Sequence, residues 1–390
     1  MVGIVLEQHP DRTRLFMQWR RMDFPLMVDP FNLLGLPFVP ATFLLDEHGV
    51  IQLSQPKLDK LPQIEDAFFN RSFDPPADTP SVQTRVPDLA QIHQAAQSGG
   101  ARDWRDYATE LTLWGGAERL DEAIEAAQQA LNLRADDTTH FRLGVIYRKR
   151  YDSPYRQDND FRRAVEHWSK ALDIDPNNYI WRRRIQQYGP RLDKPYPFYD
   201  WVPIAREEVA ARGETPIELS VEPGGAEFAQ PAQDFGAVDG QHKEPDAEGR
   251  IFPDEEPFIH IETILVPPAI VSGDTARVHV TLRPNLDIKA HWNNEAGDTA
   301  LWINLPEKWN VERRYLTVPN PTTDVSLEAR HFEFEVRVPQ DAVPGPASLS
   351  AYALYYVCED VNGVCMYRRQ NIPLNIQIKA VDGLRLRDGG

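Results

Sequence analysis

Two residues of this 390-residue chain could carry redox chemistry, Cys358 and Cys365 in the stretch YYVCEDVNGVCMYRR, and they are its only cysteines. Two thiols seven positions apart around a predicted turn could form a disulfide. Such a bond can staple a hairpin, or it can exchange with the thiolate of another protein. Closing so short a loop would stabilise the folded state by only about 2.5 kcal/mol, through the lost conformational entropy of the unfolded chain. The residues alone leave the structural disulfide and the exchangeable pair open.

The turn between the cysteines decides whether they can meet. A two-residue turn at Asn362 and Gly363 would place Cys365 opposite Asp360 and leave Cys358 on a diagonal, too far for an unstrained bridge. A four-residue loop from Asp360 to Gly363 suits the residue preferences of a type I turn and would place Cys358 directly opposite Cys365. We predict the second register.

Charged neighbours of the cysteines act in opposite directions on thiol reactivity. Glu359 and Asp360 would raise the pKa of a nearby thiol and slow its attack, whereas Arg368 and Arg369 would lower that pKa. The sequence does not decide which pair of charges lies closer to the sulfurs.

The elements that position the cysteines have a period of two, which is typical of strands. In the stretch HFEFEVRVP the apolar and charged residues alternate, so that they fall on opposite faces. Several such segments predict an antiparallel β-sandwich of immunoglobulin type over residues 257–380, followed by a tail at 381–390. Three tryptophans are expected in its core rather than on a ligand platform: Trp292, Trp302 and Trp309.

Three segments of this region resemble the amino-terminal periplasmic domain of DsbD-like thiol-disulfide interchange proteins: VSGDTARVHVTLR, HWNNEAGDTALWINLPEKW and YALYYVCEDVNGVCM. The resemblance implies an Ig-like domain whose late hairpin carries a redox pair, here Cys358 and Cys365. It also implies electron transfer between a membrane partner and thioredoxin-like proteins, and a place in the periplasm or cell envelope.

Residues 1–70 alternate short apolar runs with amphipathic stretches in the order β-α-β-β-β-α. The segments VGIVLEQH, FPLMVDP and GLPFVPATFLLDEHGVI resemble the second half of a thioredoxin-like fold, in the redoxin branch that includes TlpA-like proteins and peroxiredoxins. By this resemblance Pro40 is a candidate cis-proline bordering the substrate groove. The family's catalytic cysteines lie upstream of the first of these strands, so residues 1–70 cannot perform thioredoxin chemistry.

Two explanations of this partial resemblance are open, a degenerate domain or a sequence that begins part-way through a longer protein. We expect the second, because an apolar strand such as VGIVL is normally buried between two neighbours. The first ten residues show no secretion signal, so an export signal would belong to the upstream segment.

Helical spacing follows over residues 101–213, between a Pro-rich linker at 71–100 and an acidic linker rich in Pro and Gly at 214–256. One helical unit resembles a tetratricopeptide repeat with the insertion RYDSPYRQDND in its turn, and a weaker copy precedes it. Two units are fewer than a stable array usually needs, so neighbouring segments should cap the ends. The small and aromatic residues that carry the resemblance are Gly144, Tyr147, Ala164, Trp168 and Ala171.

Charge is uneven around these helices. Residues 141–194 contain thirteen Lys or Arg against seven Asp or Glu, and residues 195–260 contain four against fifteen. A basic surface could bind an acidic peptide from a protein partner, or it could be covered by the chain's own acidic linker. An ordinary solvated helical face is the commoner meaning of such runs. The candidate partner-binding residues are Arg148, Lys149, Arg150, Arg182, Arg183 and Arg184.

Several classes of protein are disfavoured. The net charge of −17 argues against nucleic-acid binding, and no apolar run is long enough to span a bilayer. No phosphate-binding loop, dinucleotide fingerprint or hydrolase signature appears, so we predict no cofactor. We predict no metal site from His279, His291 and His331, which lie on separate predicted strands.

The sequence therefore predicts a multidomain α+β protein with a partial thioredoxin-like segment, a tetratricopeptide-like helical module and an Ig-like sandwich. The predicted function is thiol-disulfide exchange with protein partners, and its assignment as an oxidoreductase depends on the resemblances. The alternative is a non-enzymatic tetratricopeptide adaptor whose disulfide is structural.

Overall fold

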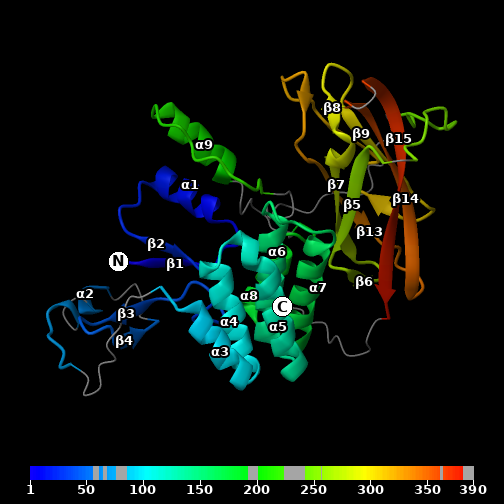
Figure 1. Ribbon diagram of the computed structural model, residues 1–390. Helices are drawn as coiled ribbons and strands as arrows, with labels where there is room; N and C mark the ends of the chain where they lie inside the picture. The colour runs from blue at the N-terminus through cyan, green and yellow to red at the C-terminus, as the bar shows by residue number, and fades with distance from the viewer. Residues whose placement is uncertain are drawn as a thin grey trace.

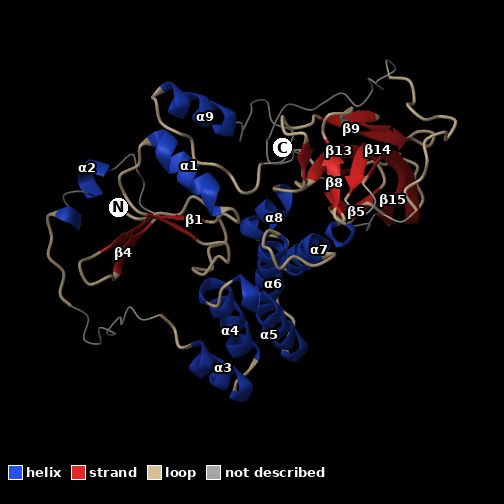
Figure 2. Cartoon of the chain, turned by 45° about the horizontal axis from the view of Figure 1, so that its top comes forward, coloured by secondary structure: helices blue, strands red, loops and turns tan. Residues whose placement is uncertain are grey.

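The computed structural model describes residues 1–55, 61–64, 68–75, 86–191, 201–223, 242–255, 257–360 and 363–380. The chain is an α+β protein (Figure 1). A set of helices lies in the middle, with short amino-terminal strands on one side and two larger sheets on the other (Figure 2). The predicted tail at 381–390 and parts of both predicted linkers lie outside the described residues.

The amino-terminal part has its elements in the predicted order: β1 (Gly3–Val5), α1 (Pro10–Arg20), β2 (Leu26–Val28), β3 (Phe43–Leu45), β4 (Ile51–Ser54) and α2 (Leu61–Ile64). In this part the described strands form two separate pairs, β1 with β2 in parallel and β3 with β4 antiparallel. The peptide bond between Val39 and Pro40 is cis, as predicted. The strands leave apolar side chains exposed, among them Ile4 and Met27.

The helical part begins earlier than predicted, because α3 (Leu89–Ser98) lies inside the segment 71–100 that composition marks as a linker. The side chain of Asp88 caps this helix, and Ala96 packs into the helical core. Each of the helices that follow packs on the next: α4 (Ala101–Trp114), α5 (Leu120–Leu133), α6 (Asp137–Tyr151), α7 (Asp160–Ile174) and α8 (Tyr179–Gln186).

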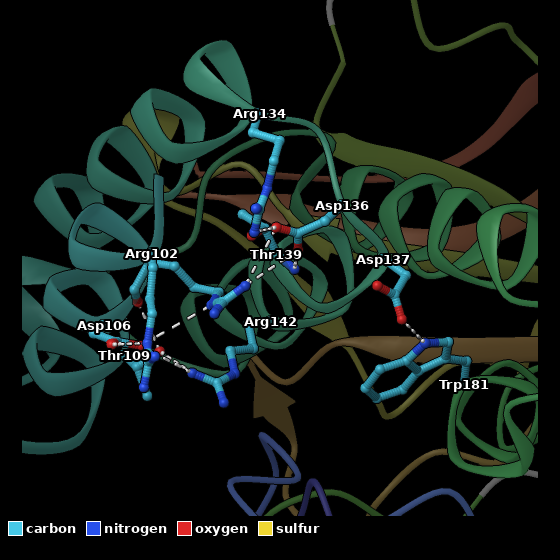
Figure 3. Close-up of polar contacts among 10 residues, drawn as sticks. Arg102, Asp106, Thr109, Arg134, Asp136, Asp137, Thr139, Arg142 and Trp181 are labelled. Carbon is cyan, nitrogen blue, oxygen red and sulfur yellow. Dashed lines mark hydrogen bonds and ion pairs between the residues drawn. The ribbon is translucent and has the colours of Figure 1, made fainter. Parts of the chain in front are cut away.

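Polar contacts fix the start of α6 against its neighbours (Figure 3). The side chain of Asp136 caps α6 by accepting the Thr139 amide at 2.7 Å, and Arg134 donates to the same carboxylate at 3.3 Å. The indole of Trp181 in α8 donates to Asp137 at 3.0 Å. Burial favours the neutral form of Asp136, but the hydrogen bonds from Thr139 and the nearby arginines, among them Arg134, lower the pKa of this carboxyl, which therefore stays charged at the helix start.

Gly144 lets α6 and α7 approach closely. A Cβ atom at this position would lie 2.4 Å from the indole nitrogen of Trp168 and 3.0 Å from the carbonyl oxygen of Ala164. Both of these neighbours are completely buried. The two helices therefore have no room for a larger side chain at this crossing.

A Gly144→Ala substitution is expected to lower the free energy of unfolding by about 1 to 2 kcal/mol. Overpacking costs roughly 1 to 3 kcal/mol, and the better helix propensity of alanine returns up to about 1 kcal/mol. Urea unfolding followed by circular dichroism measures the loss. Combining the change with Trp168→Phe, which removes the indole nitrogen, should cost less than the sum of the two single losses, and strict additivity would contradict the steric explanation.

The carboxyl-terminal part contains two sheets. The smaller has the strand order β10 (Asn310–Val311), β13 (Arg330–Arg337), β7 (Thr275–Pro284), β5 (Ile259–Val266). The larger has the order β11 (Tyr315–Val318), β9 (Thr299–Asn304), β14 (Gly345–Glu359), β15 (Val364–Lys379), β6 (Ala269–Val271), with β8 (Ala290–Asn293) also paired to β14 and β12 (Val325–Ser326) paired to β8. The described strand pairs of both sheets are antiparallel, except for β6 with β15.

The two sheets share one core. Val278 and Phe334 of the smaller sheet pack with Tyr355 and Leu374 of the larger. Trp292 is buried in this core and Trp309 packs against it, as predicted. Trp302 does not, because alternation along β9 turns its ring to the opposite face of the larger sheet.

The helical core is closed at its ends by the other two parts, as expected for so few helices. Phe31 of the amino-terminal part and Ile264 and Val266 of β5 belong to the same buried cluster as the helices. A further helix, α9 (Trp201–Ala211), packs on α1 through Val202. In the described part of the chain, no helix has the length and apolar character needed to cross a membrane.

Candidate functional site

The two cysteines face each other across a hairpin. β14 and β15 are antiparallel, and Cys358 lies directly opposite Cys365. Their Cα atoms are 4.0 Å apart and the sulfurs are bonded. The predicted register is therefore confirmed, while Val361 and Asn362 of the connecting loop lie outside the described residues.

The disulfide lies on the outer face of the larger sheet. Tyr355 and Val357 point into the core between the sheets, so alternation places Cys358 on the other face. The two halves of the bond differ in access, because Cys358 is only 6% exposed whereas Cys365 is exposed. A thiolate that approaches from solvent therefore meets the sulfur of Cys365, and Cys358 would be the leaving group.

A histidine lies beside the buried half of the bond. β8 pairs with β14 on the side away from β15, and this pairing places His291 opposite Cys358. The Nδ1 atom of His291 is 3.6 Å from a carboxylate oxygen of Asp360. A protonated imidazole at this position would stabilise the thiolate released on Cys358. In the sequence His291 stands out only as a possible metal ligand, because nothing local indicates that β8 pairs with β14.

The charged residues next to the cysteines in sequence do not surround the sulfurs. Glu359 falls on the opposite face of β14 and is buried, and Asp360 lies near His291. Arg369 is held by Asp246 at 2.7 Å, in the segment 242–255 that crosses the outer face. Arg368 donates to the sulfur of Met366. Both arginines thus have hydrogen-bond partners other than the cysteines.

A pair of tyrosines adjoins the disulfide on the same face. Tyr356 and Tyr367 are cross-strand partners next to the cysteines, and their rings stack with centroids 4.3 Å apart. Tyr367 remains 36% exposed. Burial, with the neighbouring Tyr356, raises the pKa of Tyr367 to about 12, so the ring stays neutral at physiological pH. The pair therefore offers a neutral aromatic surface beside Cys365.

The predicted basic surface needs a correction. Arg148, Arg150 and Arg184 are buried, so they are not part of an exposed surface. Arg148 binds Asp152 at 3.0 Å, Arg150 binds Asp160 at 3.0 Å, and Arg184 reaches into the amino-terminal part. The three guanidinium groups bond to other residues of the protein, because a buried guanidinium needs an anionic or carbonyl partner.

The other three predicted basic residues lie nearer the surface. Lys149 donates to the carbonyl oxygen of Thr112 at 2.6 Å, and Arg182 donates to that of Pro176 at 2.6 Å. Arg183 contacts a side chain in its own helix. These contacts leave the partner-binding role of the three residues as a prediction.

Pro40 and two of the three candidate histidines lie away from the disulfide. Pro40 precedes β3, which pairs with β4, and this pair lies on the opposite side of the helices from β14 and β15 (Figures 1 and 2). His279 and His331 lie on the smaller sheet and His291 on the larger. No group of three or more His, Cys, Asp or Glu within the described ranges is arranged to hold a metal ion.

Comparisons with known proteins do not identify a family. No family model and no curated protein matches the sequence. Similar solved structures include the sporulation control protein Spo0M from Bacillus subtilis, at 14% identity and a TM-score of 0.16 over 32% of this chain and 50% of that one. The bacterial hydrophobin BslA is 12% identical with a TM-score of 0.18 over 31% of this chain and 96% of its own. Neutral ceramidase from Pseudomonas aeruginosa is 11% identical with a TM-score of 0.14 over 67% of this chain and 36% of its own.

Proposed function

We propose that this protein exchanges thiols and disulfides with protein partners through Cys358 and Cys365. The observation that carries the proposal is the asymmetry of the bond, with Cys365 exposed and Cys358 buried opposite His291. A purely structural bond needs no such difference in access. The stacked tyrosines beside Cys365 supply a surface on which a partner could dock.

The proposed reaction has two steps. A partner thiolate attacks the sulfur of Cys365, the bond to Cys358 breaks, and Cys358 leaves as a thiolate that takes up a proton. The partner's second thiolate then attacks its own sulfur in the mixed disulfide and releases Cys365 as a thiolate, which is also protonated. The partner dithiol loses two electrons and two protons, and the Cys358–Cys365 disulfide gains them. The reverse sequence oxidises this protein's dithiol.

The proposal assigns the three parts to the redoxin/DsbD-like class. The carboxyl-terminal part would be the Ig-like sandwich with the redox hairpin, and the amino-terminal part a partial redoxin segment in which Pro40 borders a groove. The helices would be a tetratricopeptide module for a thioredoxin-like or membrane-bound protein partner, in the periplasm or cell envelope. The order of elements in residues 1–70 and the packing of Gly144 against Trp168 support these assignments.

The test is a redox titration of the intact protein in glutathione buffers, together with incubation with reduced thioredoxin. Exchange is expected, with a midpoint potential above about −300 mV. The matched control is the double variant Cys358→Ser, Cys365→Ser, which should oxidise no thioredoxin. A midpoint well below about −300 mV without any exchange would favour the adaptor with a structural disulfide instead.

A further inference from the structure

A cavity of about 680 Å³ lies where the three parts of the chain meet. Its walls come from α1, from the end of α6 and its connection to α7, from residues 219–223, and from β7 and β13 of the smaller sheet. Sites for small ligands have volumes of roughly 300 to 1,000 Å³. The cavity thus has the size of a ligand site, and the disulfide is not part of its lining.

The wall formed by the smaller sheet is polar, and its carboxylate is paired with neighbouring cationic side chains of the same sheet. Alternation that sends Val278 and Phe334 into the core sends charged residues of β7 and β13 toward the helices. Glu333 accepts from Arg277 at 2.8 Å and lies 3.3 Å from His279. Burial opposes the charge on Glu333, but His279 and Arg277 hold the pKa of this carboxyl well below its usual range. This wall therefore presents a carboxylate that is already matched by cations.

Arginines from both walls gather around one aromatic ring, that of Tyr151 in α6. The guanidinium carbons of Arg148, Arg283 and Arg156 lie 5.0, 5.3 and 5.8 Å from the centre of the Tyr151 ring. Asp152 neutralises Arg148 at 3.0 Å, and Glu262 lies 3.5 Å from Arg283. The Arg156 side chain makes no hydrogen bond or ion pair to any residue that the structure describes.

Positive charge is in excess over the whole lining. Five arginines line the cavity against three carboxylates. Each carboxylate already pairs with an arginine: Asp152 with Arg148, Glu333 with Arg277, and Glu222 with Arg206 outside the cavity. Residues 219–223 therefore form a wall without supplying an anion for Arg156. The insertion between α6 and α7, unexplained by the helical repeat, is the segment that carries this arginine.

We propose that the cavity binds a multiply charged carboxylate, held by Arg156 and Arg283 beside the Tyr151 ring. Guanidinium groups bind carboxylates through paired hydrogen bonds, and several of them together favour more than one negative charge. The hydrogen bond from Arg283 to the Tyr151 hydroxyl at 2.8 Å holds that guanidinium in place. Such a carboxylate can come from a free polycarboxylic acid or from the acidic side chains of a peptide.

The experiment is calorimetric titration of the intact protein with two probes, citrate and an end-blocked pentaglutamate peptide. The wild-type protein is expected to bind at least one of them, with affinity that falls as salt is added. An Arg156→Gln variant should bind about tenfold more weakly or worse, because a charge-assisted hydrogen bond is lost. Arg102→Gln on α4 is the matched control, since it removes the same charge from a side chain that is 80% exposed and outside the cavity.

The two probes separate the two sources of the ligand. Binding of citrate alone indicates a free acid, and binding of pentaglutamate alone indicates an acidic peptide, and either result supports the site. Arg156 is exposed, so its substitution should leave the helical circular dichroism and the unfolding midpoint unchanged. The proposal is overturned if neither probe binds the wild-type protein at millimolar concentration, or if Arg156→Gln and Arg102→Gln bind equally well.

Discussion

Replacing Asp160 by alanine is expected to lower the free energy of unfolding by about 3 to 5 kcal/mol. Asp160 is completely buried at the first residue of α7, where it accepts from Arg150 at 3.0 Å and from the Gln157 amide at 2.8 Å. Arg150 is buried as well. The substitution would leave the Arg150 guanidinium without its buried counter-ion, and an uncompensated buried charge is among the costliest changes in a protein.

A matched control for this prediction lies on the same guanidinium. Asp121 also pairs with Arg150, but its side chain is 60% exposed. An Asp121→Ala variant should therefore lose less than about 1 kcal/mol, because water replaces an exposed partner. Urea unfolding followed at 222 nm measures both losses. Similar losses in the two variants would mean that burial is not what makes the Asp160 pair important.

A double substitution separates the cost of an unpaired charge from the cost of lost packing. Arg150→Met combined with Asp160→Leu removes both charges and keeps apolar volume in place. Replacing a whole buried ion pair is often nearly neutral, so this variant should lose less stability than Asp160→Ala alone. A larger loss in the double variant would show that the pair itself stabilises α6 against α7.

The second large effect concerns the two single-cysteine variants. Cys358→Ser leaves the exposed Cys365, and Cys365→Ser leaves the buried Cys358. In the folded protein the free thiol of Cys358→Ser is expected to form mixed disulfides at least about tenfold faster than that of Cys365→Ser, since attack requires access to the sulfur. Stopped-flow reaction with an aromatic disulfide reagent measures the two rates.

Unfolding supplies the control for this comparison. In denaturant the two thiols have the same access, so their rates should converge to within roughly a factor of two. Equal rates in the folded protein, or a faster reaction at Cys358, would overturn the assignment of Cys365 as the attacked sulfur. A faster Cys365 would identify Cys358→Ser as the variant that traps a partner as a mixed disulfide.

Much of the fold follows from local pattern. The order of elements in residues 1–70 is confirmed, because the short apolar runs predict strands and the amphipathic stretches predict helices. The alternation in β13 places Phe332 and Phe334 in the core, as predicted. Composition misplaced the start of the helices at α3, because the Pro-rich stretch ends only one residue before the Asp88 cap.

The sequence by itself determined the hairpin that holds Cys358 opposite Cys365. The cysteines are only seven positions apart, so turn chemistry and strand period are enough to set their register. Tertiary structure alone decided their surroundings, because the strand that places His291 opposite Cys358 lies more than sixty residues upstream in sequence. It also decided that Arg148 is buried and that Arg156 and Arg283 lie beside the Tyr151 ring. Contacts between such distant residues depend on how whole elements pack. The local sequence of one segment does not indicate which distant segment it will contact.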